Sequence, residues 1–164
     1  MSNSYVIRPP QSVEEWAAVK KLLIDYKNEF EDDTCFTSFE AELSHIEAMY
    51  QEPGKYKLIV VEEPGGRVVG CVGMRTLSPG VAEMKRLYVI PSHRRLHLGK
   101  RLANEIIDIA DSHAYQRMIL DTMTEMKDAQ RLYQRLGFEV IKPYNNQDPA
   151  KVICYEKILS AGNA

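Results

Sequence analysis

The sequence has few cysteines and no long hydrophobic run, and each absence excludes a class of protein. Cys35, Cys71 and Cys154 are odd in number and share no C-x-x-C spacing, so the pattern fits neither a disulfide framework nor a zinc knuckle. No apolar run reaches the roughly 18 residues that a membrane-spanning helix needs. The start, M-S-N-S-Y-V-I-R-P-P, lacks the basic and then apolar layout of a signal peptide. We therefore expect a cytoplasmic chain with reduced thiols and no membrane partner.

Internal repeats, low-complexity tracts and linker-like stretches are also missing from the 164 residues. The chain is 45% hydrophobic and 27% charged, which is the ordinary balance of a globular protein. We therefore predict a single domain over residues 1–164, long enough to enclose a proper core. We predict no bound metal, because the cysteines lack the spacing of metal ligands.

The pattern is most informative from Glu83 to Leu102. Up to Val89 the sequence is rich in β-forming residues, and Pro91 then ends regular pairing because proline has no N–H to donate. From about Leu96 the period becomes helical, with one apolar face. That face holds Leu98, Leu102, Ile106, Ile109 and Ala110. The stretch therefore predicts a strand, a turn and a helix in direct succession.

The turn between that strand and that helix is strongly basic. Residues 85–101 hold six of the 21 Lys and Arg residues, two histidines and no acid, which leaves 15 Lys and Arg against 23 Asp and Glu elsewhere. Unpaired N–H groups and the helix dipole make a helix N-terminus attractive to anions. The carboxyl ends of strands are also where α/β sheets bind ligands. We predict a site for a phosphate-bearing ligand; the alternative is a solvated basic surface on an amphipathic helix.

These residues resemble the coenzyme A-binding motif of the GNAT superfamily of N-acetyltransferases. That motif has Leu-x-Val on a strand and then Arg/Gln-x-x-Gly-x-Gly/Ala at the start of a helix. In this sequence Leu87 and Val89 match the strand pair, Arg94 matches the first position of the second element, and Gly99 matches the last. The resemblance implies that the phosphate-bearing ligand is coenzyme A.

Two positions depart from the motif. His97 stands at the middle glycine, and Arg95 stands where many members have a glycine directly after the arginine. Glycine at such positions lets the backbone approach phosphate without a Cβ atom. His97 therefore either has ordinary helical dihedral angles or carries backbone strain.

The rest of the chain alternates turn signals with short periodic segments. Strands are predicted at residues 4–8, 56–63, 67–77, 81–90, 117–121, 138–141 and 152–157, and helices at 13–30, 39–51, 96–114 and 125–136. Ser12 and Thr124 are the predicted N-caps of the first and last helices, and Gly137 is the predicted C′ residue. From Tyr5 to about Ile158, this order resembles the GNAT fold. It implies an α/β (α+β) fold with a mixed, mostly antiparallel sheet, a splay between the fourth and fifth strands, and about four helices.

A second segment, A-Q-R-L-Y-Q-R-L-G-F at Ala129–Phe138, resembles the Ala-x-x-x-Tyr-x-x-x-Gly-Phe helix of the same family. Met126 stands where many members have Asn. By the resemblance, Tyr133 is the general acid that protonates the leaving thiolate, and a phenol is a suitable donor for that step. The alternative is an amphipathic core tyrosine.

The resemblance also assigns residues to the cofactor. Pantetheine would pair with strand backbone at Leu87 and Val89, where a nearby N–H polarises the thioester carbonyl, and the pyrophosphate would lie on the N–H groups of residues 94–100. The predicted cofactor-binding residues are Leu87, Val89, Arg94, Arg95, His97, Leu98, Gly99, Lys100 and Tyr133.

Glu83 is the predicted general base, because some family members, histone acetyltransferases among them, have their base at this position. Two readings stay open beside it: a carboxylate paired with its basic neighbours Lys85 and Arg86, and a chain of water molecules acting as the base. Cys71 is predicted to be a small buried hydrophobe rather than a nucleophile.

Three further side chains fall near the acceptor end of the site if the fold is that of the family. Arg75, Asp121 and Tyr144 could there select an acceptor with a carboxylate or an amine; the alternative is ordinary surface polarity.

We predict an enzyme, a cytoplasmic acetyl-CoA-dependent N-acetyltransferase that transfers the acetyl group directly to a primary amine of a small molecule or amino acid derivative. Dimers are common in the family, so a homodimer is one expected state. Two alternatives are a CoA-binding regulatory or sensor module without turnover and a protein-amine acetyltransferase. Nucleic-acid binding is the least favoured class, because the basic run is short, the chain is formally −2, and no aromatic stacking platform accompanies the run.

Overall fold

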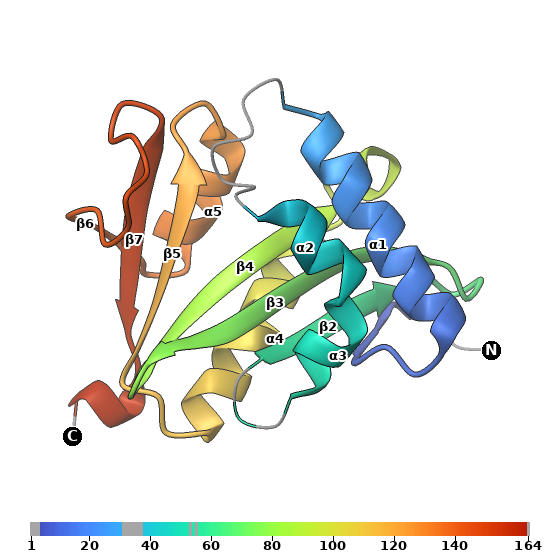
Figure 1. Ribbon diagram of the computed structural model, residues 1–164, viewed down its shortest axis with the longest axis horizontal. Coiled ribbons are helices and arrows are strands. Elements are labelled where there is room, and N and C mark those ends of the chain that lie inside the picture. Colours follow the sequence, from blue (N-terminus) through green and yellow to red (C-terminus); the bar gives the residue numbers. More distant parts are fainter. Residues whose placement is uncertain (1–3, 31–37, 53, 55, 164) are drawn as a thin grey trace.

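The computed structural model describes residues 4–30, 38–52, 54 and 56–163, so Cys35 and Pro53 lie outside the described residues. Seven strands form one sheet in the order β1-β2-β3-β4-β5-β7-β6 (Figure 1). The strands are β1 (Val6–Arg8), β2 (Tyr56–Glu62), β3 (Val68–Ser78), β4 (Val81–Val89), β5 (Arg117–Met123), β6 (Glu139–Ile141) and β7 (Val152–Ile158). The helices are α1 (Val13–Asn28), α2 (Phe39–Ser44), α3 (Ile46–Gln51), α4 (Leu98–Ser112) and α5 (Lys127–Arg135), with 3₁₀ turns at η2 (Pro91–His93) and η3 (Ser160–Asn163).

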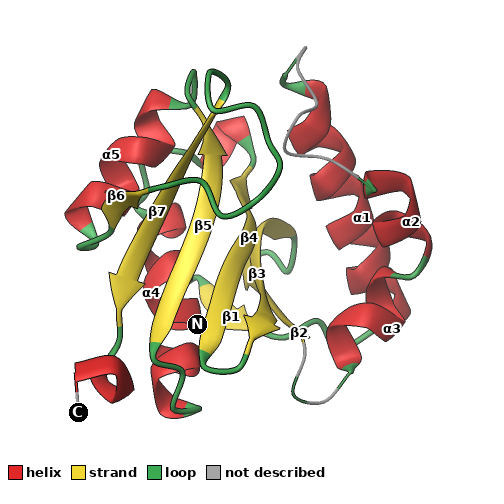
Figure 2. Ribbon diagram, turned by 60° about the vertical axis from the view of Figure 1, so that its left-hand side comes forward, coloured by secondary structure: helices red, strands yellow, loops and turns green. Residues whose placement is uncertain are grey.

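Helices cover both faces of this sheet. Helices α1, α2 and α3 lie on one face, while α4 and α5 lie on the other (Figure 2). Each helical layer buries an apolar stripe against the strands. The side chains with no exposed surface include Val19 and Leu23 of α1 and Leu102 and Ile106 of α4. Trp16 of α1 is also a core residue. Within the described residues, no helix is both long and apolar enough to span a bilayer.

The predicted helix over residues 39–51 is wrong in one respect, because it is two short helices. The break is at His45, whose φ of −127° and ψ of 18° leave the helical region. Ser44 Oγ donates a hydrogen bond to the Ala41 carbonyl at 2.9 Å, and His45 Nδ1 lies 3.3 Å from the same oxygen. Side chains that bond nearby backbone in this way compete with the helical ladder.

Of the two predicted N-caps, one is confirmed and one is wrong. Ser12 caps α1, with its side chain accepting the Glu15 N–H at 3.2 Å. Thr124 does not cap α5, because its hydroxyl contacts the Ala150 and Lys151 carbonyls and the helix begins only after Met126. At the other end, Gly137 has a φ of +91°, as expected of a C′ glycine.

Strand β4 carries the irregularity that opens the sheet. Cys71 pairs with Tyr88 and Gly73 pairs with Lys85, so β4 has one more residue than β3 between the two pairs, and Arg86 in this bulge has a φ of +61°. The parallel pairing of β4 with β5 covers only Val81–Glu83 and Arg117–Ile119. Beyond those residues the two strands run apart. The predicted fold, with its splay between the fourth and fifth strands, is confirmed, although the part of the chain that the structure describes contains five α-helices rather than about four.

Candidate active site

The predicted cofactor residues line one groove beside the open part of the sheet. Its volume is about 960 Å³, and its walls come from the end of β4, the loop after it, the first turn of α4 and one face of α5. All nine predicted residues are among its lining: Leu87, Val89, Arg94, Arg95, His97, Leu98, Gly99, Lys100 and Tyr133. The groove is therefore assembled from both sequence motifs, which lie some thirty residues apart in the chain.

The two residues that replace motif glycines have left-handed backbone. Arg95 has a φ of +68° and His97 a φ of +58°. Of the two readings left open for His97, the strained one is confirmed, because a side chain costs free energy in this region of φ. The loop thus has the left-handed conformation that glycine would adopt easily, although its residues here carry side chains. These are the exposed guanidinium of Arg95 and the exposed imidazole of His97.

The first turn of α4 faces this groove without a side-chain cap. His97 is the N-cap residue and accepts the Arg101 N–H at 3.1 Å, but its side chain bonds no helix N–H. The first N–H groups of a helix have no intrahelical acceptor. The N–H groups of Leu98, Gly99 and Lys100 are consequently oriented to bind an anion in the groove.

Arg94 is held by the protein itself. Its Nε donates to the Val89 carbonyl at 3.0 Å, its Nη2 donates to the Glu29 carboxylate at 2.8 Å, and its guanidinium lies 5.6 Å from the Tyr88 ring centroid. These contacts bind the loop to the end of β4 and to α1. Because the Arg94 guanidinium is already paired with Glu29, a ligand in the groove would contact the backbone of Arg94 rather than its charged group.

His93 and His97 are four residues apart, a spacing that would bring two metal ligands together on one α-helix. They do not share a helix. His93 lies in η2, where its Nε2 is 2.6 Å from Glu63 Oε2, whereas His97 caps α4. No group of three His, Cys, Asp or Glu side chains gathers as metal ligands within the described residues.

Tyr133 lies in α5 at the inner wall of the groove. The side chain is buried, with its ring centroid 5.9 Å from that of Phe138 and 6.1 Å from that of Tyr155. The C′ glycine Gly137 turns the chain so that Phe138 packs back on this ring. Tyr133 thus combines a fixed ring with a position on the groove, as an acid or a cofactor contact requires.

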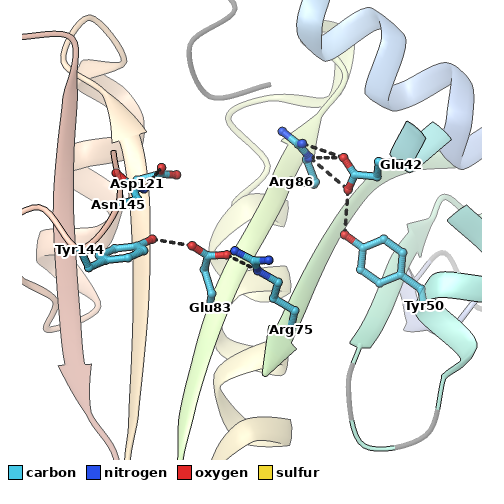
Figure 3. Close-up of polar contacts among 8 residues, drawn as sticks. All are labelled: Glu42, Tyr50, Arg75, Glu83, Arg86, Asp121, Tyr144 and Asn145. Carbon is cyan, nitrogen blue, oxygen red and sulfur yellow. Dashed lines mark hydrogen bonds and ion pairs between the residues drawn. The ribbon is translucent and has the colours of Figure 1, made fainter. Parts of the chain in front are cut away.

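A second cavity, of about 480 Å³, lies on the other side of the same open strand. It is bounded by α2, α3, β3, β4, β5 and the loop between β6 and β7. The three side chains predicted near the acceptor end, Arg75, Asp121 and Tyr144, all line it, and Glu83 lies among them (Figure 3). We call this space the acceptor cavity.

Glu83 is buried and both of its carboxylate oxygens have partners. Arg75 Nε donates to Oε1 at 2.6 Å and the Tyr144 hydroxyl donates to Oε2 at 2.7 Å (Figure 3). The alternative of a carboxylate paired with Lys85 and Arg86 is thus wrong in its partners, which are Arg75 and Tyr144. Glu83 as the general base stays a prediction. Burial, and the nearby negative charges of Glu83 and Asp121, raise the pKa of Tyr144, which therefore stays a hydrogen-bond donor.

A buried ion pair that the sequence did not predict forms the opposite wall. Arg86 donates to Glu42 through Nε at 3.0 Å and through Nη2 at 2.6 Å, and both side chains are 5% exposed. The Tyr50 hydroxyl donates to the same carboxylate at 3.1 Å (Figure 3). No local pattern marks Glu42, because its partner is 44 residues away in the chain.

Asp121 and Lys85 are the remaining charged side chains of this cavity. Asn145 Nδ2 donates to Asp121 Oδ2 at 2.8 Å. Burial raises the pKa of Asp121, and the Glu83 charge adds to that effect. Burial lowers the pKa of Lys85, and the positive charges of Arg86 and Arg75 contribute. Each group is thus in surroundings that disfavour its charged form.

Cys71 is a core residue, as predicted. It has no exposed surface, its Sγ donates to the Arg86 carbonyl at 3.5 Å, and burial raises the pKa of the thiol to about 12. A thiol in this condition is a poor nucleophile.

The sheet opens between the parallel strands β4 and β5, and a cavity lies on either side of the open strand. The model of the family described as "Acetyltransferase (GNAT) family" matches residues 16–138 of this chain. The chain therefore belongs to the GNAT family of N-acetyltransferases.

Individual relatives agree with this assignment. An uncharacterised N-acetyltransferase of Schizosaccharomyces pombe is 34% identical over 148 residues, which are 90% of this chain and 88% of that one. A GNAT acetyltransferase of Staphylococcus aureus superposes with a TM-score of 0.79 at 18% identity, over 96% of this chain and all of the other. A phosphinothricin acetyltransferase of Sinorhizobium meliloti, solved with AcCoA, gives 0.77 at 16% identity, over 96% of this chain and 90% of that one.

Proposed function

We propose that the protein transfers the acetyl group of acetyl-CoA directly to a primary amine of a small molecule or amino acid derivative. The observation that carries this proposal is the position of two cavities on either side of the open strand β4. One has a helix N-terminus and exposed basic side chains, and the other has a cluster of carboxylates and cations. Donor and acceptor could therefore be bound together, as direct transfer requires.

The groove fits coenzyme A in size and in chemistry. A volume of about 960 Å³ suits a long, flexible ligand, and the N-terminus of α4 with Arg95 and Lys100 suits its phosphates. The end of β4 offers backbone groups beyond its last pair with β5 to an extended pantetheine chain. The relative from Sinorhizobium meliloti, with the same fold, was solved with AcCoA, which supports the same donor here.

The transfer makes a C–N bond and breaks a C–S bond. The acceptor ammonium first loses one proton, for which Glu83, directly or through water, is the proposed base. The amine then attacks the thioester carbon while a backbone N–H in the bulge of β4 stabilises the oxygen. As the C–S bond breaks, Tyr133 gives its proton to the departing thiolate and recovers one from the acetylated nitrogen. One proton is released overall, and Tyr133 returns to its starting state.

Calorimetric titration of acetyl-CoA and CoA tests the donor site. We expect micromolar binding by the wild type and about tenfold or greater loss in the double variant Arg95→Glu/Lys100→Glu. Lys20→Glu, an exposed change on α1, is the matched control for added negative charge. Absence of binding by the wild type would contradict the proposal.

A CoA-release screen across amines tests turnover. Release with at least one amine supports the transferase. Binding without release across a broad panel would favour the alternative, a CoA sensor. Release only with peptides that carry a free amine would favour a protein acceptor.

A further inference from the structure

The acceptor cavity has an unusual balance of charge. Six charged side chains line it, three acidic and three basic, and four of them are joined in two ion pairs. Glu42 pairs with Arg86, and Glu83 pairs with Arg75, both with nitrogen–oxygen distances of 2.6 Å. Within each pair, the acidic and the basic side chain neutralise one another. The remaining two side chains, Asp121 and Lys85, are one acid and one base.

Asp121 and Lys85 face the cavity from opposite sides of the opening in the sheet. The last residues that pair β4 with β5 are Glu83 and Ile119. Lys85 and Asp121 each stand two residues further along, so they lie on the same face of the sheet as that last pair. Glu83, Lys85 and Asp121 all line the cavity, in agreement with this register.

Neither side chain has an ion-pair partner among the described residues. Within the described residues, no hydrogen bond or ion pair involves the Lys85 side chain, and Asp121 has the neutral Asn145 amide as its partner. Burial lowers the pKa of Lys85 and raises that of Asp121. The opposite charges nearby, Glu42 and Glu83 for Lys85 and Lys85 and Arg86 for Asp121, offset these shifts only in part. A ligand that supplied both counter-ions would remove this cost.

We propose that the acceptor is a small amino acid, with its ammonium group on Asp121 and its own carboxylate on Lys85. This inference rests on the proposed function and narrows its acceptor. An amino acid carries one positive and one negative group a few ångström apart, so it matches one free acid and one free base. A simple amine would leave the half-buried Lys85 ammonium without an ion-pair partner, and a peptide N-terminus has no carboxylate beside its amine.

Matched acceptors test the proposal. The 20 common amino acids, their carboxamides and the corresponding decarboxylated amines are compared by kcat/KM for CoA release. We expect the best amino acid to exceed its own amide and amine by about 10- to 100-fold, the range of one buried charge-assisted hydrogen bond. Equal values for acid and amide would overturn the inference, and a preference for amides would point to a peptide acceptor.

Two variants separate the roles of the two residues. Lys85→Met should raise KM for the amino acid by a similar factor, leave KM for its amide unchanged, and so abolish the preference for the acid. Asp121→Asn should raise KM for acid and amide alike, because both carry the amine. Lys20→Met is the control for loss of an exposed lysine, and an unchanged Kd for acetyl-CoA shows that the variants are folded.

The two levels of the hypothesis fail in different ways. If no amine releases CoA, or acetyl-CoA does not bind, the proposed transferase function is wrong. Suppose that amines are acetylated but Lys85→Met leaves the ratio of kcat/KM for the amino acid to kcat/KM for its amide unchanged. The transferase function is then supported, and the proposal of an amino acid acceptor is wrong.

Discussion

Tyr133 is the residue whose chemistry is easiest to separate from its packing. Replacement by Phe keeps the ring against Phe138 and Tyr155 and removes only the hydroxyl. If Tyr133 is the general acid, kcat should fall by about 100-fold, at the lower end of what acid catalysis supplies. The Kd for acetyl-CoA should change little. Steady-state kinetics and calorimetry measure the two quantities.

The alternative, that the Tyr133 hydroxyl has only a packing role, can be tested with the same variant. If the hydroxyl only filled space, Tyr133→Phe would change the midpoint of thermal unfolding without changing the dependence of kcat on pH. If Tyr133 is the general acid, an acyl donor whose leaving thiol has a lower pKa should reduce the fall in kcat, and an equal fall with that donor would argue against acid catalysis.

Arg95 and His97 make a prediction about stability. Each has a positive φ, which costs an L residue about 1–2 kcal/mol that glycine does not pay. Glycine loses more conformational entropy on folding, so His97→Gly should gain about 0.5–1 kcal/mol, or roughly 1–4 °C in Tm for a chain of this size. Differential scanning calorimetry measures this shift.

A glycine substitution in regular helix is the control for His97→Gly. Glu105 is exposed and lies within α4, so Glu105→Gly should lower stability by about 0.5–1 kcal/mol. Destabilisation by both variants to the same extent would show that the left-handed backbone at His97 costs nothing.

At the scale of elements, the ion pair of Glu42 and Arg86 joins helix α2 to the bulged strand β4. Arg86→Met leaves a buried carboxylate without its partner and should cost about 3–5 kcal/mol. The double variant Glu42→Leu/Arg86→Met removes both charges and should recover much of that loss. Urea denaturation of the four proteins in this cycle gives the coupling free energy.

An exposed ion pair provides the comparison. Arg117 and Glu156 are also 2.6 Å apart, but their side chains are 41% and 26% exposed. Arg117→Met should therefore cost less than about 1 kcal/mol. Similar losses for Arg86→Met and Arg117→Met would mean that burial of the first pair has no energetic consequence.

Local sequence patterns were sufficient for the order of the elements and for a set of residues that the structure brings together in one groove. Each depends on contiguous signals, such as the change from strand to helix period around Pro91 and the glycine after α5. What the sequence could not predict arises from contacts distant in the chain. Examples are the Glu42–Arg86 pair and the partners of Glu83, because Tyr144 is 61 residues away.

Two local predictions failed for a related reason. The break at His45 and the late start of α5 after Met126 both depend on side chains that compete for backbone groups. Ser44 bonds the Ala41 carbonyl, and the Thr124 hydroxyl contacts carbonyls of the loop before β7. Periodicity alone does not record which of two hydrogen bonds forms.

At the scale of the whole molecule, acid stability depends in part on the N-terminal strand. Arg8 of β1 bonds Glu15 of α1 at 2.7 Å and also contacts Glu62 of β2. Its hydrogen bond, with that from the Gln11 N–H, lowers the pKa of Glu15 from 4.5 to about 2. A depressed carboxyl pKa adds stability that is present above pH 4.5 and is lost as the pH falls toward 2.

The free energy of unfolding of the wild type should therefore decrease between pH 4.5 and pH 2, and Glu15→Gln should flatten that decrease. Denaturant titrations at several pH values measure the slope. Glu14→Gln, an exposed change in the same turn, should keep the slope of the wild type. If the free energy of unfolding of Glu15→Gln depended on pH as steeply as that of the wild type, the Arg8–Glu15 ion pair would not be a cause of the acid sensitivity.

The short seam between β4 and β5 has a consequence for how the protein opens. Three residue pairs join the half of the sheet made by β1–β4 to the half made by β5–β7. Without ligand, amide protons of β4 beyond Glu83 that face the opening should exchange with solvent quickly. Acetyl-CoA bound along this edge of β4 should slow the exchange of these amide protons. It should also slow the exchange of amide protons in β5 and β7, on the other side of the seam. Hydrogen exchange would then show that acetyl-CoA joins the two halves of the sheet into one cooperative unit.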